Sequence, residues 1–233
     1  MTLVKQILVI GLSTTSHMNE TLGGVLMGYF TAQQMGDVTL IGSSPTTGTQ
    51  PTFFTLSTFP WNRLTEYDVL VTLSPLKDST SGAAEPEDVT TAHVHAVTEF
   101  VRGGKGCVAL HLAAAPFHED FTQMIGGRFL THPPLQQFAI NVDDPRHPIT
   151  QGIPAFTLMD ELYVTDHDPA AIHILLSASF EGKRCPMAWV KPYGAGRVVY
   201  LAPGHDFRTF LHPLFLQLVE QAVRWASQNA QSP

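Results

Sequence analysis

The sequence lacks the features that mark secreted, membrane-spanning and nucleic-acid-binding proteins. Two cysteines, Cys107 and Cys185, are too few for a disulfide framework in 233 residues, so we expect a reducing, cytoplasmic setting. No uninterrupted run of about 18 apolar residues occurs, so no membrane-spanning helix is predicted. The 13 basic residues form no cluster and are outnumbered by 20 acidic residues, which makes nucleic acid and anionic membranes poor partners.

The chain is also short of charge. Charged residues make up 14% of the sequence, against a usual share of about 25%. Hydrophobic residues make up 44%, enough for a large core, so disorder and coiled coil are excluded for the chain as a whole. A weakly charged surface favours burial against a second copy, and a homo-oligomer is therefore one hypothesis.

Short apolar runs alternate with helical patterns in the first half of the chain, which is typical of a parallel sheet with helices on both faces. The unbroken apolar run at 6–12 favours a central strand rather than a signal peptide. The other strands predicted in this half are 37–41, 68–73 and 106–111. Helices are predicted from Met18 to Gly36, from Pro86 to Gly103, and after Pro213 near the end of the chain.

The second half follows a different pattern. Strand-like runs succeed one another without long helices between them, which predicts antiparallel hairpins added to the parallel sheet, with a hairpin turn at 193–196. These runs are 137–142, 156–164, 172–179, 186–191 and 196–202. No linker divides the chain, so we expect one α/β domain over residues 1–233.

Histidines follow three of the predicted strands. Ligands of open α/β sheets bind beyond the carboxyl ends of the strands, and His111, His205 and His17 each lie at or after such an end. A helix starting at 113–115 would disfavour the imidazolium form of His111, leaving a ring able to bind a metal or exchange a proton. For each histidine the alternative is a structural role, as a buried or loop residue hydrogen-bonded to backbone.

Two carboxylates, Asp160 and Glu161, interrupt an apolar run. Burial without a partner would be costly, so at least one should meet a cation, a metal or a hydrogen-bond donor. Strand alternation would point them to opposite faces, so only one can enter a shared site. His132 follows the sequence 126–129, which we expect to be a loop able to fold over the crevice.

Other residues fit structural roles. His147 and His212 precede proline and are explained by turns, and His93 lies on the apolar face of a predicted helix. Nucleotide-binding glycine loops, His-Glu-x-x-His and Cys-x-x-Cys are all absent. Cys107 and Cys185 occupy no nucleophile elbow and are expected to be ordinary thiols.

Several segments, in order and spacing, resemble the ThuA-like (trehalose utilisation) family of the class I glutamine amidotransferase-like superfamily. They include YDVLV at 67–71, IGGRF at 125–129, DELY at 160–163 and GHD at 204–206. Further matching segments are 103–111, 132–133, 147–150, 188–189, 194–198 and 224–225. The resemblance implies a three-layer, flavodoxin-like, doubly wound and mostly parallel sheet with added antiparallel strands.

The resemblance also implies a site and a substrate class. The rim site would be built from imidazoles and one acid: His17, His111, His132, Glu161 and His205. The implied role is metabolism of trehalose or a related disaccharide through keto-sugar intermediates. Glutamine amidotransferases carry a cysteine at the elbow where this chain has His111 and Leu112, so glutaminase activity is not expected.

The main hypothesis is a carbohydrate-active enzyme with a small sugar-like ligand. His111, Glu161 and His205 would be catalytic, and His17, His132 and Asp206 would bind substrate. The same three catalytic residues could instead hold a divalent metal such as zinc. The alternatives are a non-catalytic binding or assembly module, whose histidines would point apart, and a cysteine-dependent hydrolase.

Overall fold

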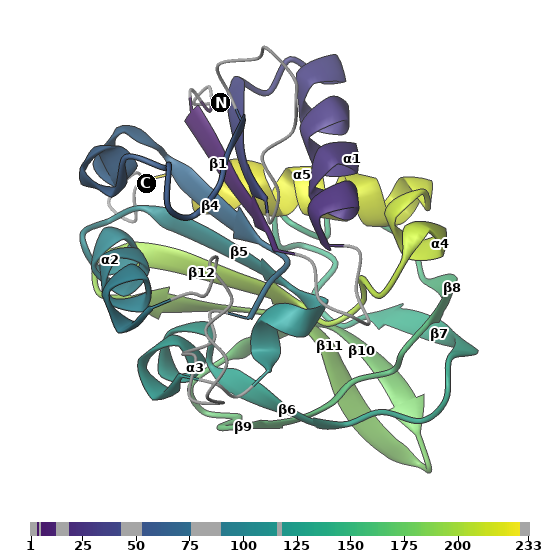
Figure 1. The fold of residues 1–233 in the computed structure, drawn as a ribbon. Helices are drawn as coiled ribbons and strands as arrows, with labels where there is room; N and C mark the ends of the chain where they lie inside the picture. Colours follow the sequence, from purple (N-terminus) through teal and green to yellow (C-terminus); the bar gives the residue numbers. More distant parts are fainter. Residues whose placement is uncertain are drawn as a thin grey trace.

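A large sheet forms the centre of the protein (Figure 1). The computed structural model describes residues 4, 6–12, 19–42, 53–75, 90–115 and 118–228. Six neighbouring strands run parallel to one another. In sheet order they are β3 (Phe53–Phe54), β2 (Asp37–Gly42), β1 (Gln6–Gly11), β4 (Val69–Thr72), β5 (Gly106–Leu110) and β12 (Gly196–Leu201).

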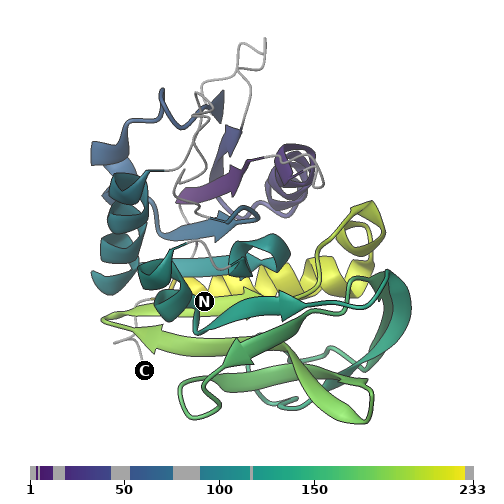
Figure 2. The ribbon, with the colours of Figure 1, turned by 60° about the horizontal axis from the view of Figure 1, so that its bottom comes forward.

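Four antiparallel strands continue the same sheet beyond β12. They are β11 (Lys183–Tyr193), β10 (His173–Phe180), β7 (Gln136–Val142) and β8 (Phe156–Asp160). A separate ribbon pairs β6 (Gly127–Thr131) with β9 (Val164–His167). Figure 2 shows the green antiparallel strands at the bottom of the view, with the purple and blue N-terminal strands above them. The predicted fold class is confirmed.

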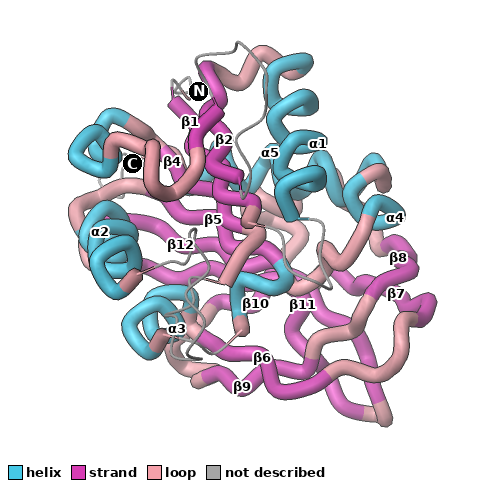
Figure 3. The backbone as a smooth tube through the Cα atoms, in the orientation of Figure 1, coloured by secondary structure: helices cyan, strands magenta, loops and turns pink. Residues whose placement is uncertain are grey.

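Helices cover both faces of the sheet, as Figure 3 shows. On one face, α1 (Asn19–Ala32) packs on β1 and β2, α5 (Pro213–Ala226) packs on β5 and β12, and α4 (Phe207–Phe210) lies beside them. On the other, α2 (Thr91–Arg102) lies against α3 (Glu119–Ile125). Two 3-10 turns, η1 (Trp61–Glu66) and η2 (His111–Ala114), complete the described elements.

The packing of α5 follows directly from its sequence. The apolar residues on the side of the helix that faces the sheet recur at helical spacing and are buried: Phe215, Leu218, Val219, Ala222, Val223 and Ala226. The helix approaches β5 closely at Gly106, where a Cβ atom would lie 2.4 Å from the Ala226 carbonyl oxygen. A side chain at position 106 would therefore push the helix off the sheet.

Pro86, the predicted start of a helix, lies outside the described residues; within them α2 begins at Thr91, where Thr90 and His93 form a reciprocal capping box. Local expectations failed at three places. The helix expected at 113–115 is a single 3-10 turn. The loop expected at 126–129 is largely β6, paired with β9, and the run at 156–164 divides into β8 and β9 around three irregular residues.

The strand directions place the end of β8 beside the ends of β5 and β12. Pairing alternates through β11, β10 and β7, so β8 points the same way as β12 although it lies at the far edge of the sheet. Residues that follow β5, β12 and β8 therefore share one rim. Within the described ranges, no helix has the length and apolarity needed to cross a bilayer.

Candidate functional site

His111 follows β5 in a strained backbone conformation. Its φ of +45° lies in the left-handed region, which residues other than glycine rarely adopt. The Tyr200 hydroxyl donates to the His111 carbonyl at 3.0 Å. Gly204 lies so close that a Cβ atom there would be 3.1 Å from the His111 Cβ. The surrounding chain thus holds this histidine in a tight turn directly after β5.

The ring of His111 is oriented by hydrogen bonding and stacking. Its Nδ1 lies 2.8 Å from the carbonyl oxygen of Ala202, which can only accept, so Nδ1 carries the proton. Tyr163 stacks on the ring with centroids 4.0 Å apart. These contacts direct Nε2 toward Glu161, whose Oε2 is 3.3 Å away.

Glu161 is the centre of the cluster. His205 Nδ1 lies 3.2 Å from the same oxygen, Oε2, and His132 Nε2 lies 3.7 Å from Oε1. The Glu161 side chain is 13% exposed, which limits solvent screening of these charges. Burial alone would raise the pKa of Glu161, but the hydrogen bond with His111 and the charge of the neighbouring imidazoles lower it below its ordinary value. Glu161 is therefore a carboxylate at neutral pH.

Asp160 fixes the two loops that carry Glu161 and His205. Its fully buried carboxylate accepts from the backbone amides of Gly204 at 2.9 Å and His205 at 3.3 Å. It also accepts from the Glu161 amide at 2.6 Å and from the Thr209 hydroxyl. β8 ends at Asp160, so the alternation expected to point the two carboxylates to opposite faces does not apply to Glu161. Both carboxylates lie at the same site, where Asp160 binds backbone amides and Glu161 faces the imidazoles.

The remaining predicted site residues are placed differently. His17 lies outside the described residues. Asp206 caps α4, accepting from the Arg208 amide at 2.8 Å and pairing with the Arg208 guanidinium, which holds the pKa of Asp206 below its usual range. His132 reaches the edge of the cluster and is more exposed than His111 or His205.

The histidines expected to be structural have structural contacts. His147 Nδ1 accepts from the Ile149 amide at 3.2 Å, and His212 packs on Phe156 at the start of α5. His93 is half-buried, caps α2 and stacks on Trp61.

Two aromatic side chains belong to the cluster but were not singled out in the sequence. Tyr163 lies between the imidazoles of His111 and His132, and Phe129 packs against Tyr163 with centroids 4.5 Å apart. Burial raises the pKa of Tyr163, so its hydroxyl stays protonated. Their presence in the matching segments IGGRF and DELY was the available signal.

The cysteines have no nucleophilic character. Cys107 is buried within β5, and burial raises the pKa of its thiol to about 12. Burial also raises the pKa of Cys185. A thiolate at neutral pH is thus disfavoured at both positions.

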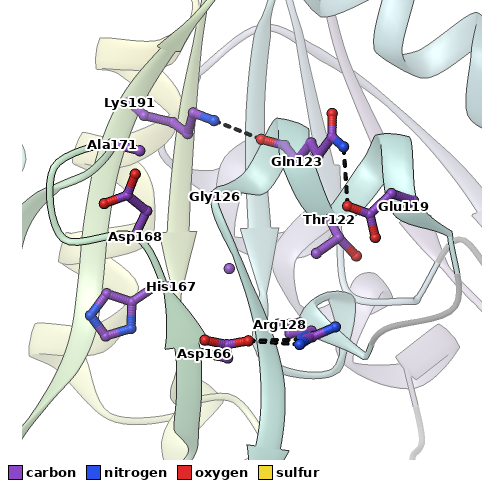
Figure 4. Close-up of a pocket in the computed structure, with 11 residues that line it drawn as sticks. Glu119, Thr122, Gln123, Gly126, Arg128, Asp166, His167, Asp168, Ala171 and Lys191 are labelled. Atoms are coloured by element: carbon purple, nitrogen blue, oxygen red, sulfur yellow. Dashed lines mark hydrogen bonds and ion pairs between the residues drawn. The ribbon is translucent and has the colours of Figure 1, made fainter.

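A cavity of about 470 Å³ opens between α3, the β6–β9 ribbon and β11 (Figure 4). Arg128 pairs with Asp166 at 2.8 Å, and Lys191 donates to the backbone carbonyl of Gln123 at 2.6 Å. No residue of the cluster lines it. These contacts stabilise the ribbon and the end of α3, and we assign the cavity no chemistry.

The family model for ThuA, described as trehalose utilisation, matches residues 40–226. The chain belongs to the ThuA family. A search of curated proteins gives no match. The segment of this ThuA protein that the family model matches includes all four residues of the cluster: His111, His132, Glu161 and His205.

Solved structures share the fold. A ThuA-like protein from Parabacteroides merdae has a TM-score of 0.74 and 19% identity, over 97% of this chain and 90% of that one. A ThuA-like protein from Bacteroides uniformis has a TM-score of 0.71 and 22% identity, over 95% and 91%. A β-galactosidase from Bacillus circulans matches 96% of this chain with 30% of its own, at 11% identity and a TM-score of 0.62.

Proposed function

We propose that this ThuA protein is an enzyme of carbohydrate metabolism that transfers protons on trehalose, a related disaccharide or the corresponding keto-sugar. The observation that carries the proposal is the approach of two imidazoles, His111 and His205, to one carboxylate oxygen of Glu161 at 3.3 and 3.2 Å. Imidazoles exchange protons near neutral pH, and a buried carboxylate is an effective base. The family description, trehalose utilisation, supplies the substrate class.

The residues divide into roles by their contacts. Glu161, a largely buried carboxylate within reach of two imidazoles, is the base that accepts a proton from a sugar carbon or hydroxyl group. His205 is more exposed than His111 and is placed to pass a proton to or from the substrate. His111 is held by Ala202 and Tyr163 and orients Glu161. His132 lines the open side of the cluster, where a sugar hydroxyl can reach it.

A non-catalytic binding module is less well supported. Such a module would leave the histidines pointing apart or bound wholly to backbone carbonyls. One nitrogen of His111 and one of His132 do contact carbonyls, at Ala202 and Pro133, but the other nitrogen of each ring is directed to Glu161.

The test is turnover and binding of sugars by the purified protein. Trehalose, other disaccharides and their keto derivatives would be followed by NMR for chemical change and by calorimetry for binding. We expect Glu161→Gln and His205→Gln to lower turnover by about 100-fold or more. The control is His173→Gln, which breaks a histidine–carboxylate pair with Asp144 at the surface. Binding without any turnover would favour the module instead.

The remaining proposals rest on composition. We propose that the chain is one cytoplasmic domain and that its weakly charged surface supports association of identical copies. Light scattering of the purified protein tests the association directly.

A further inference from the structure

Three ligand atoms at the rim are spaced like the ligands of a small cation. His111 Nε2, His205 Nδ1 and one Glu161 oxygen all lie within 4.8 Å of one another. Oε2 of Glu161 lies 3.3 Å from His111 Nε2 and 3.2 Å from His205 Nδ1. In a tetrahedral zinc site, with ligands at about 2.0–2.1 Å from the ion, neighbouring ligand atoms lie about 3.3 Å apart.

Hydrogen bonding alone explains these distances less well. Nδ1 of His111 donates to Ala202, so Nε2 can donate to Glu161 only when the ring carries a second proton, and in a neutral ring its lone pair would face the carboxylate. A second proton would remove this repulsion and give an ion pair, but charge-assisted N–H···O bonds are about 2.7–2.9 Å long. The observed 3.3 Å is longer and matches two ligands sharing an ion.

The surroundings of the three atoms resemble the support of a metal site. Metal-binding imidazoles usually donate their other N–H to a carbonyl or carboxylate, as His111 does to Ala202. Asp160 holds the backbones of Glu161 and His205 in one place, so the ligands are positioned before any ion binds. Tyr163 packs on the face of His111 and fixes its ring plane.

We propose that His111 Nε2, His205 Nδ1 and Glu161 Oε2 bind one divalent cation of the zinc class. Two imidazoles favour zinc, cobalt, nickel or iron over magnesium and calcium, which prefer oxygen ligands. Three protein ligands leave a fourth position open to water or to substrate. His132 lies against the other carboxylate oxygen and is not a member of the ligand set.

The inference deepens the proposed function, and its use there rests on that proposal. A cation at this position would polarise the carbonyl of a keto-sugar, or a pair of adjacent sugar oxygens. Glu161 and His205 would then act as ligands instead of exchanging protons, and His132 is the nearby imidazole outside the ligand set. Binding of the ion itself depends only on the three ligands, so it can be tested without a substrate.

The experiment is a titration of the full chain, stripped with chelator, with Zn²⁺ by calorimetry and with Co²⁺ by visible absorption. We expect one ion per chain and the intense bands of tetrahedral Co²⁺. Glu161→Gln and His205→Gln should each weaken binding by more than about 100-fold. The matched control His173→Gln, and His132→Gln at the edge of the cluster, should stay within about threefold of the unmodified chain.

Three results would overturn the metal site: no stoichiometric ion, equal binding by the ligand variants, or an equal loss in His132→Gln. Circular dichroism of each variant separates loss of ligands from loss of fold. The two proposals fail separately. If the stripped protein turns over sugar and binds no metal, the proposed metal site is wrong and the carbohydrate function stands. If the protein binds metal but neither binds nor turns over any sugar, the carbohydrate function is wrong and the metal site stands.

Discussion

The parallel and antiparallel halves of the sheet contribute different parts of the site. His111 and His205 follow β5 and β12, which are neighbours in the parallel half. Glu161 follows β8, five places from β5 in the sheet order. In a flat sheet five strands span about 24 Å, yet the His111 and Glu161 side chains are 3.3 Å apart. The antiparallel half must therefore curl back over the rim.

The difference teaches where the site is vulnerable. The parallel half holds its two histidines by direct strand pairing between β5 and β12. The acid is held by the contacts of Asp160, which joins the end of β8 to the loop after β12. Breaking these contacts should separate the halves, whereas changes elsewhere in the parallel half should leave the site intact.

The largest effect is expected for Asp160→Ala. Four donors lose a buried charged acceptor, from Gly204, His205, Thr209 and Glu161, which should destabilise the protein by about 3 kcal/mol or more. Urea unfolding measures the loss. The control is Asp168→Ala, where an exposed aspartate caps a turn at Ala170. A loss at Asp160 no larger than this control would show that the halves are joined in another way.

A smaller effect is expected for Gly204→Ala. Position 204 has a φ of +144° and faces His111, so a methyl group both strains the backbone and presses on that histidine. We expect a cost of about 1–3 kcal/mol and a further loss of sugar turnover and metal affinity. Gly152→Ala, at φ +75° with open space around it, measures the backbone cost alone. If Gly204→Ala and Gly152→Ala lower sugar turnover equally, the methyl group at position 204 does not act by displacing His111.

Removal of a helix cap should affect stability without affecting the site. Thr90 caps α2, and this cap contacts neither His111 nor Glu161. Thr90→Ala should lower the free energy of unfolding by about 1 kcal/mol. Thr90→Ser keeps the hydroxyl and should retain most of the stability. Thermal unfolding and the Co²⁺ titration are measured together. A change in metal affinity would mean that the parallel half is coupled to the site more tightly than described.

The smallest expected effect is a pH dependence from Glu161. Its pKa is lowered in the folded state, so the ionised carboxylate contributes stability that is complete above the ordinary value of 4.5. That contribution is lost as the pH falls toward the lower folded value. In chelator, the difference in unfolding free energy between the unmodified chain and Glu161→Gln should therefore shrink from pH 6 to about pH 3. If this difference in unfolding free energy grows as the pH falls, the ionised Glu161 does not stabilise the fold and the described His–Glu interaction is wrong.

Much of the fold could be predicted because its signals are local. The buried strands are apolar runs, and every core position expected in α5 is buried. The start of α2 at Thr91 is hard to predict because a threonine–histidine capping box is a weaker signal than Pro86, which itself lies outside the described residues. The sequence does not predict β6, because its pairing partner, β9, lies far along the chain.

The site was predicted less completely because it depends on the curl of the sheet. His111 and His205 could be chosen from strand ends, and Glu161 from its apolar neighbours and the family resemblance. Nothing local marks Asp160 as the residue that joins the halves, since its donors in the other half lie 44 to 49 positions away. The stacking of Tyr163 on His111 is equally long-range.

The most direct test of the account is a double-mutant cycle between Glu161 and His205, read out as sugar turnover. If the two halves build one centre, Glu161→Gln, His205→Gln and the double variant should all lose activity to a similar extent, because the second change removes nothing more. Losses that multiply in the double variant would show that the two residues act independently. That result would contradict a single site built jointly by the parallel and antiparallel halves of the sheet.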